Sequence, residues 1–341
     1  MAETPESTTK PATVTSQPRY DRSGRLSQVL AWVGIIAGAV FIAAVIFFSA
    51  TFLGWYSGGH YSWHRGGAAG QLSPRSSQQS APSQTLRLKV ELPFIGLYVH
   101  TGGVAVDTAG NVYVASGGND RVLKLPAGSS TQVELPFTGL KSPMGVAVDT
   151  VGNVYVTDSF HNRVLKLPAG SSTQVELPFT GLHRPGGVAV DAAGNVYVTD
   201  FVDNRMLKLP AGSSTQVELP FTGLHFPMGV AVDSAGNVYV TNDDNNRVLK
   251  LPAGSTTQVE LPFTGLHHPV AVAVDTAGNV YAADHDNNRV LKLPAGSSTQ
   301  VELPFTGLTG PMGVAVDSAG NVYVTNHDND EVLELPAPYA S

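Results

Sequence analysis

Histidine and aspartate gather in two short windows of the sequence, where they could ligate a metal, transfer protons or bind a polar ligand. One window precedes runs such as GVAVD, and the other separates runs such as NVYV from RVLKL; together they hold eight of the ten histidines. Phenylalanine and arginine are interleaved with them. The candidate residues for a ligand-binding surface are Asp158, Phe160, His161, His183, Arg184, Asp200, Phe201, Asp203, His225, Phe226, Asp243, Asp244, His267, His268, His285, Asp286, His327 and Asp328.

Three hypotheses for these residues stay open. A surface of aspartate and histidine could hold a divalent metal or supply an acid/base pair, as a lyase or lactonase would need. An acidic surface with phenylalanine anchors could instead bind a ligand or a protein. Aspartate and asparagine could also do no more than satisfy loop backbones. The sequence shows no single asymmetric cluster of the kind that an active site needs, so binding is favoured over catalysis. We therefore expect no catalytic residue and no cofactor. Whether these residues bind a metal stays open.

The windows belong to a unit that is repeated six times, which indicates a repeat architecture. Each unit contains four short β-branched or alternating runs separated by turn residues, and the apolar content falls from the first run to the fourth. This gradient places the first strand at a crowded axis and the proline-containing fourth strand at the rim. The sequence therefore predicts an all-β, six-bladed β-propeller with four antiparallel strands per blade over residues 85–341. The repeats start at Val90, Val133, Val175, Val217, Val259 and Val301.

The two ends of the array predict how the ring closes. The last unit lacks a fourth run, whereas an unassigned run, TLRLKVELPF, stands at residues 85–94. We expect this run to complete the sixth blade beside Glu331–Leu335 and so to remove an exposed sheet edge. In such a blade both variable windows lie on one face, opposite the constant DTAGN and PAGSSTQ loops. A rigid frame with one variable face predicts recognition on that face.

The copied polar residues have structural explanations. The aspartate that ends each first strand, such as Asp191, is expected to accept hydrogen bonds from its own turn, and the following Gly194 suits a positive φ. The arginine that opens each third strand, such as Arg205, is expected to pair with acidic or carbonyl groups of a neighbouring blade. Glu331 takes the arginine position in the last unit, so the pairing must differ there.

Residues 29–55 contain no charged residue over twenty-seven positions, more than the roughly 20 needed to cross a bilayer, and they predict one transmembrane helix. Arg19, Arg22 and Arg25 precede the span closely, which favours a cytoplasmic N-terminus and an extracytoplasmic propeller. We therefore expect a single-pass protein of the cell membrane.

The segments beside this span are expected to lack a packed core. Residues 1–28 are rich in Thr, Ser, Pro and Glu and predict a short disordered cytoplasmic tail. Residues 56–84 are rich in Gly, Ser, Pro and Gln and predict a flexible linker. Gly34 and Gly38 form one GxxxG step, which could pair two spans weakly.

Composition excludes several classes of protein. There is no cysteine, so disulfide frameworks and thiolate metal sites are excluded. Residues 86–341 hold fourteen Lys and Arg against twenty-four Asp and Glu, a deficit of 10. Because the variable face carries only Lys141 and Arg184 as basic residues, we expect no nucleic-acid partner.

The unit PMGVAVDTVGNVYVTDSFHNRVLKL at Pro143–Leu167 resembles the NHL repeat, with its Pro-x-Gly start, Asp-x-x-Gly-Asn turn and Asn-Arg before the third strand. With the span in front, the chain is similar to the extracytoplasmic sensor domains of mycobacterial receptor serine/threonine kinases. The kinase motifs themselves are missing from this sequence, so the resemblance implies a sensor without a kinase, and we expect no enzyme.

Together, these features predict a membrane-anchored propeller. We expect its variable face to bind an extracytoplasmic protein, peptide or cell-envelope ligand, as a sensor or an adhesion module would. The alternative is a metal-dependent propeller enzyme of the lyase or lactonase type.

Overall fold

The computed structural model describes residues 89–98 and 100–339, which belong to the compact unit Ser80–Ser341. The predicted tail, transmembrane helix and linker lie outside the described residues. Within the described ranges, no helix has the length and apolar character needed to cross a bilayer.

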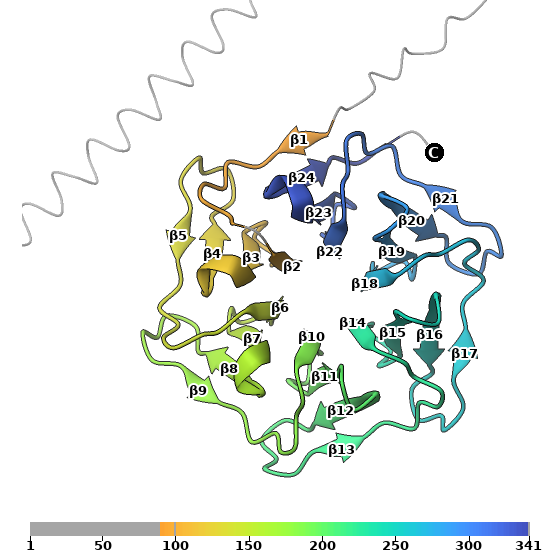
Figure 1. The fold of residues 1–341 in the computed structure, drawn as a ribbon, viewed down its shortest axis with the longest axis horizontal. Coiled ribbons are helices and arrows are strands. Elements are labelled where there is room, and N and C mark those ends of the chain that lie inside the picture. The colour runs from red at the N-terminus through yellow and green to blue at the C-terminus, as the bar shows by residue number, and fades with distance from the viewer. Residues whose placement is uncertain (1–88, 99, 340–341) are drawn as a thin grey trace, which may run out of the picture. The chain divides into compact units, whose positions relative to one another are not determined.

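Six four-stranded antiparallel sheets surround a central axis, which confirms the predicted six-bladed propeller (Figure 1). We number the blades 1 to 6 by their innermost strands: β2 (Thr101–Val106), β6 (Pro143–Val148), β10 (Pro185–Val190), β14 (Pro227–Val232), β18 (Pro269–Val274) and β22 (Pro311–Val316). The second strands are β3 (Val112–Ser116), β7 (Val154–Asp158), β11 (Val196–Asp200), β15 (Val238–Asn242), β19 (Val280–Asp284) and β23 (Val322–Asn326). The third strands are β4 (Arg121–Leu125), β8 (Arg163–Leu167), β12 (Arg205–Leu209), β16 (Arg247–Leu251), β20 (Arg289–Leu293) and β24 (Glu331–Leu335). The outermost strands are β5 (Val133–Glu134), β9 (Val175–Glu176), β13 (Val217–Glu218), β17 (Val259–Glu260), β21 (Val301–Glu302) and β1 (Val90–Glu91).

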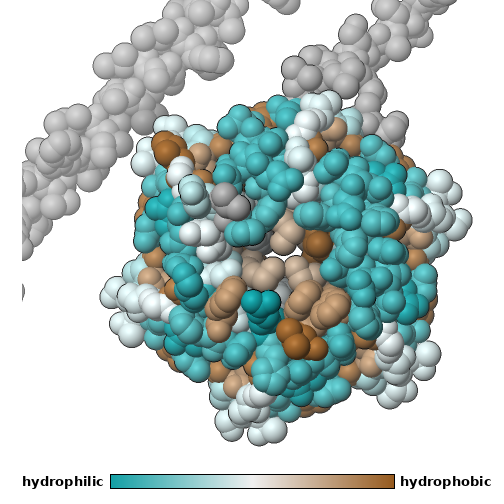
Figure 2. Space-filling model, viewed as in Figure 1, coloured by the Kyte–Doolittle hydropathy of each residue, from teal (hydrophilic) through white to brown (hydrophobic). Residues whose placement is uncertain are grey.

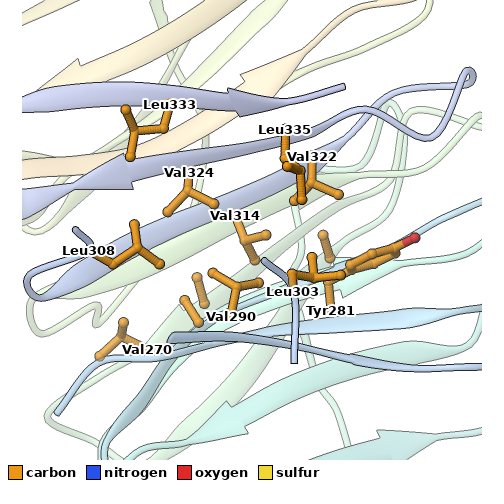
Figure 3. Packing of buried hydrophobic residues seen from close by; sticks show 13 residues of the cluster. Val270, Tyr281, Val290, Leu303, Leu308, Val314, Val322, Val324, Leu333 and Leu335 are labelled. Atoms are coloured by element: carbon orange, nitrogen blue, oxygen red, sulfur yellow. The ribbon is translucent and has the colours of Figure 1, made fainter. Parts of the chain in front are cut away.

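Burial follows the apolar gradient of the repeat. Every residue of the second strands is buried, whereas the short outermost strands are largely exposed. The apolar side chains pack between adjacent blades, as between blades 5 and 6, where Tyr281 and Val290 lie against Val314 and Val322 (Figure 3). Non-directional burial between blades is the main stabilising term of such a ring.

The first strands approach one another so closely at the axis that five of them carry glycine at the third position and the strand of blade 5 carries Ala271. A Cβ on Gly145 of blade 2 would lie 2.7 Å from the carbonyl oxygen of Gly186 in blade 3. A side-chain hydroxyl bridges the same two blades, because Thr157 Oγ1 accepts from Gly145 N and donates to Gly186 O, both at 2.7 Å.

The ring closes with a strand from the N-terminal end of the described residues, as predicted. Strand β1 pairs antiparallel with β24, with Val90 opposite Glu334, and Leu92 N donates to Val332 O at 2.8 Å. Lys89 Nζ donates to Thr306 O at 2.5 Å. At the equivalent seam between other blades a glutamine makes the contact, so the closure is chemically distinct.

One hydrogen-bond network explains the copied turn. Asp191 Oδ1 accepts from the backbone amides of Ala193 (3.0 Å) and Asn195 (2.9 Å). Asp191 Oδ2 accepts from Asn195 Nδ2 (2.6 Å) and from the Tyr197 hydroxyl (2.9 Å). The φ of Gly194 is +83°, as the turn requires. The same network recurs at Asp107, Asp149, Asp233, Asp275 and Asp317, so the predicted scaffold role is confirmed.

Candidate functional site

The two variable windows of each blade meet on one face, which we call the variable face. In blade 2, Pro143 pairs with Asp158 and Asp158 pairs with Arg163, so the start of β6 lies beside the loop between β7 and β8. Phe160 N donates to Lys141 O at 3.2 Å and ties the two windows together. The short turns between second and third strands lie toward the viewer in Figure 1, and Figure 2 shows the same face as a surface.

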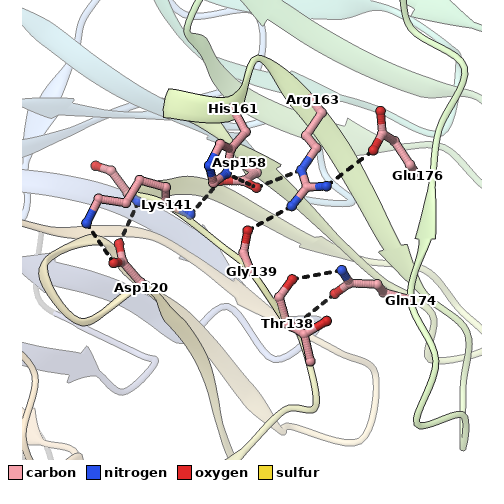
Figure 4. A network of polar contacts seen from close by, with 10 residues as sticks. Asp120, Thr138, Gly139, Lys141, Asp158, His161, Arg163, Gln174 and Glu176 are labelled. Atoms are coloured by element: carbon pink, nitrogen blue, oxygen red, sulfur yellow. Dashed lines mark hydrogen bonds and ion pairs between the residues drawn. The ribbon is translucent and has the colours of Figure 1, made fainter.

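Two of the predicted site residues lie beneath this face and support its loops. Asp158 is fully buried and accepts hydrogen bonds from Lys141 N (2.6 Å) and Arg163 Nε (2.8 Å), and His161 Nδ1 lies 2.9 Å from it (Figure 4). Asp200 is likewise buried and accepts from His183 N at 2.7 Å. The sequence placed both carboxylates on the ligand-binding face, but the structure gives them the role of loop supports.

The arginines pair in part as expected. Arg163 contacts two carboxylates of its own blade, Asp158 and Glu176, and donates to Gly139 O at 2.8 Å (Figure 4). Gly139 lies on the connection that arrives from blade 1, so only the carbonyl contact crosses between blades. The expected pairing between blades is therefore confirmed for the carbonyl group, whereas the carboxylates that pair with Arg163 belong to its own blade. Glu331 replaces the arginine in blade 6 and accepts from Asn326 Nδ2 at 3.1 Å.

A ring of six residue pairs surrounds the axis on the variable face; we call them the rim pairs. Each pair consists of two residues from neighbouring blades. One directly follows the second strand of a blade, and the other, which has a positive φ, directly precedes the first strand of the next blade. Because the repeats are arranged around the axis, equivalent positions carry different side chains at each boundary between two blades. The pairs are Gly117 with Ser142, Ser159 with Arg184, Phe201 with Phe226, Asp243 with His268, His285 with Gly310, and His327 with His100.

Several rim pairs make direct contacts between blades. The rings of Phe201 and Phe226 stack with centroids 4.8 Å apart, and Asp243 Oδ1 lies 3.0 Å from His268 Nδ1. A Cβ on Gly310 would lie 3.1 Å from His285 Nε2. The rim pairs therefore bring together predicted site residues from neighbouring units.

A second set of predicted residues lies farther out and is more exposed. Three histidines each pair with a loop aspartate of their own blade. The Nδ1 to Oδ2 distances are 2.8 Å for His183 and Asp203, 2.7 Å for His225 and Asp244, and 2.9 Å for His267 and Asp286. The Arg184 guanidinium stacks on the Phe160 ring at 4.7 Å.

The chemistry of the variable face is unevenly distributed. Phe160 and Val202 are 55% and 44% exposed, and Val202 directly follows Phe201 of the stacked pair in blades 3 and 4. Blades 5 and 6 present histidine, aspartate and asparagine in the same loops. In Figure 2, brown and tan surfaces gather around the central opening and over β10 and β14, whereas the loops over β18 to β24 are teal.

The central opening was not predicted as part of the site. A cavity of about 80 Å³ lies along the first strands, and its lining includes Met144, Met228, Val270 and Met312. The only feature of the sequence that could have indicated this cavity was the methionine that follows the proline in PMG. The lining residues are glycine, alanine, valine and methionine, so the cavity wall formed by the described residues carries no titratable side chain.

Local contacts shift the pKa of several site residues. The hydrogen bond to Asp203 raises the pKa of His183. Burial raises the pKa of Asp243, although the His268 hydrogen bond opposes this shift. The hydrogen bond from His285 lowers the pKa of Asp286, and a second one from His267 adds to this effect.

The structure brings one group of predicted residues into a convergent cluster, which the sequence did not indicate. His267, His268 and Asp286 each place one potential ligand atom within 4.8 Å of the others. The cluster combines both windows of blade 5, and Asp243 of blade 4 contacts it through His268. His161 and Asp328 lie on the same face but are not members of this group.

Comparisons with known proteins agree with this architecture. Residues 182–209, 224–251 and 266–293 match the NHL repeat. A segment of 72 residues is 55% identical to part of the serine/threonine-protein kinase PknD of Mycobacterium tuberculosis. This match covers 20% of the chain, and the chain covers only 10% of the kinase's length.

Solved structures of low sequence identity share the fold. A gluconolactonase from Xanthomonas campestris has a TM-score of 0.60 at 15% identity, covering 70% of this chain and 86% of that chain. A chain of the nidogen/laminin complex has a TM-score of 0.58 at 21% identity, covering 64% and 86%. Virginiamycin B lyase from Staphylococcus aureus has a TM-score of 0.56 at 12% identity, covering 71% and 82%. At these identities the likeness establishes the propeller fold alone.

Proposed function

We propose that this propeller of NHL repeats, similar in part to PknD, is an extracytoplasmic recognition domain that binds a protein, peptide or cell-envelope ligand through its variable face. The similarity to a segment of a serine/threonine-protein kinase supports a sensor role.

The contrast between the two faces is the observation that carries the proposal. One face repeats the same Asp, Asn and Tyr network in every blade. On the other face, the same six slots hold aromatic, acidic, imidazole and glycine residues. Loops on a rigid frame carry recognition in many folds, because the frame fixes their positions while their side chains vary.

The chemistry of the variable face supports a ligand with apolar and basic groups. Stacked phenylalanines, together with exposed Phe160 and Val202 on the same face, provide apolar anchors of the kind that dominate binding energies. The surrounding aspartates give an acidic border, which attracts cationic partners and speeds their association.

The location of the domain is part of the same proposal. Residues 29–55 would anchor the chain in the cell membrane with the N-terminus in the cytoplasm and the propeller outside. Gly34 and Gly38 would allow weak pairing of two such spans.

A metal-dependent lyase or lactonase is the alternative, since propellers with these activities share the fold. An active site generally needs a concave pocket with convergent titratable groups. The central cavity is lined by apolar residues and glycine, and the histidine and aspartate pairs lie on the exposed face. We therefore expect binding without turnover.

Capture of partners from the cell envelope and culture fluid tests the proposal. The full chain is compared with a variable-face variant, Phe160→Ala with Val202→Ala and Asp244→Asn, and with a constant-face control, Val151→Ala with Thr276→Ala. We expect the native chain and the control to capture the same partner, whereas the variable-face variant should capture about tenfold less of it. Equal capture by all three proteins would contradict the proposal.

A further inference from the structure

One carboxylate of blade 5 lies among three imidazoles. Asp286 Oδ2 is 2.9 Å from His267 Nδ1 and 4.0 Å from His268 Nε2, and Asp286 Oδ1 is 2.8 Å from His285 Nδ1. Imidazole nitrogen and carboxylate oxygen are common ligands of zinc and neighbouring transition metals. Tetrahedral ligands at about 2.0–2.1 Å from such an ion lie about 3.3 Å apart, within the range of these separations.

A second carboxylate orients one of the imidazoles. Asp243 Oδ1 lies 3.0 Å from His268 Nδ1, and the Asp243 side chain is only 16% exposed. When Nδ1 donates its proton to Asp243, the lone pair of Nε2 is directed away from this bond and toward Asp286. A carboxylate that holds the far nitrogen of a ligating histidine is the usual outer contact of a metal site.

The backbone holds both windows in place without a metal. His267 N donates to Asp284 Oδ1 at 2.6 Å, and His268 N donates to Asn246 Oδ1 at 2.8 Å. Asp286 N donates to His267 O at 3.2 Å, so the loop that carries the carboxylate is tied to the loop that carries the imidazoles. The ligand groups are therefore positioned before any ion binds.

Blade 4 offers an internal comparison, because its loops have the same length. His225 and Asp244 stand where blade 5 has His267 and Asp286, and their side chains are 2.7 Å apart. Phe226 stands where blade 5 has His268, so blade 4 offers only one imidazole at this place. Blade 5 therefore differs from blade 4 by a second imidazole nitrogen, His268 Nε2, near the same carboxylate.

We propose that His267, His268 and Asp286 form a binding site for a divalent transition-metal ion, with zinc as the expected occupant. Asp243 acts as a positioning residue for His268, and His285 does so for Asp286. Side chains that are 57%, 40% and 41% exposed leave the remaining coordination positions to water or to a donor group of a partner. This site goes beyond the proposed recognition function, and it stands whether or not a partner is found.

Zinc titration by calorimetry, with cobalt absorption spectra to report the ligand geometry, tests the site in the full chain. All proteins carry His60→Ala and His64→Ala, because these are the two histidines outside the variable windows and could themselves bind zinc. The variant His268→Phe copies the residue that blade 4 carries at this position, so we expect it to fold. We expect one equivalent of zinc to bind to the parent protein, and we expect His268→Phe to abolish this binding.

Two adjacent aspartates provide a matched control pair. Asp243→Asn is expected to weaken zinc binding by about 10–100-fold through loss of the outer contact. Asp244→Asn, which removes the partner of His225 and not that of His268, should change the affinity much less than Asp243→Asn does. Absence of saturable binding to the parent protein, or equal binding by the parent and His268→Phe, would overturn the site. Melting curves without metal verify that each variant is folded.

Discussion

At the scale of single residues, identical residue types have opposite roles in different parts of one repeat. Asp191 closes a turn on the constant face, Asp200 supports a loop from below, and Asp203 is partly exposed on the variable face. The sequence separated the first from the others, because Asp-x-x-Gly-Asn is a recognisable turn. It could not separate Asp200 from Asp203, since burial depends on how the loop folds back over the strand end.

The turn carboxylates predict a pH dependence of stability. Burial acts to raise the pKa of Asp149 and Asp191, but the hydrogen bonds from the following asparagine, tyrosine and backbone amides lower it overall. Because the folded pKa lies below the ordinary value of 3.8, these groups stabilise the fold above that value and lose their contribution as the pH falls through the folded pKa.

We therefore expect Asp149→Asn with Asp191→Asn to lower the free energy of unfolding near neutral pH by about 1 kcal/mol per site. The difference from the native protein should shrink as the pH falls below the ordinary aspartate value of 3.8, because the unfolded state then binds protons that the folded carboxylates, with their lower pKa, do not yet bind. Melting temperatures measured from neutral pH to below this value provide the comparison. A difference that stays constant or grows toward low pH would argue against the turn network as the cause.

At the scale of strands and blades, the residues repeated in every unit predicted the fold well. The four runs per unit form four strands, and Val90–Glu91 of the unassigned run form the closing strand β1. The contacts between blades were not predictable in the same way. Asp243 and His268 meet because one blade ends its second strand where the next begins its first, and this geometry leaves no pattern inside one repeat. The cluster in blade 5 was missed for the same reason.

Closure by β1 predicts the effect of a truncation. A chain that starts at residue 95 loses the partner of β24 and exposes an unpaired sheet edge. We expect this chain to be oligomeric or insoluble, whereas a chain that starts at residue 85 should remain a monomeric propeller. Size-exclusion chromatography and melting curves distinguish the two. A soluble, monomeric protein with an unchanged melting temperature after the longer truncation would refute the closure scheme.

At the scale of the whole molecule, the two faces of the ring have different constraints. The constant face repeats one network six times, and the axis tolerates little more than glycine where blades approach one another. The variable face combines an apolar region near blades 3 and 4 with a histidine and aspartate region on blades 5 and 6. This asymmetry supports a surface that recognises a partner and carries a metal site within it.

Covalent footprinting in the native cell envelope tests this account most directly, because the partner does not have to be identified first. Labelling of the full chain in the envelope is compared with labelling of the purified chain. The account predicts that exposed Phe160 and Val202 are labelled less in the envelope, whereas Val151 on the constant face, which is 71% exposed, is labelled equally in both. Protection of Val151 without protection of Phe160, or equal labelling at all three residues, would contradict recognition through the variable face.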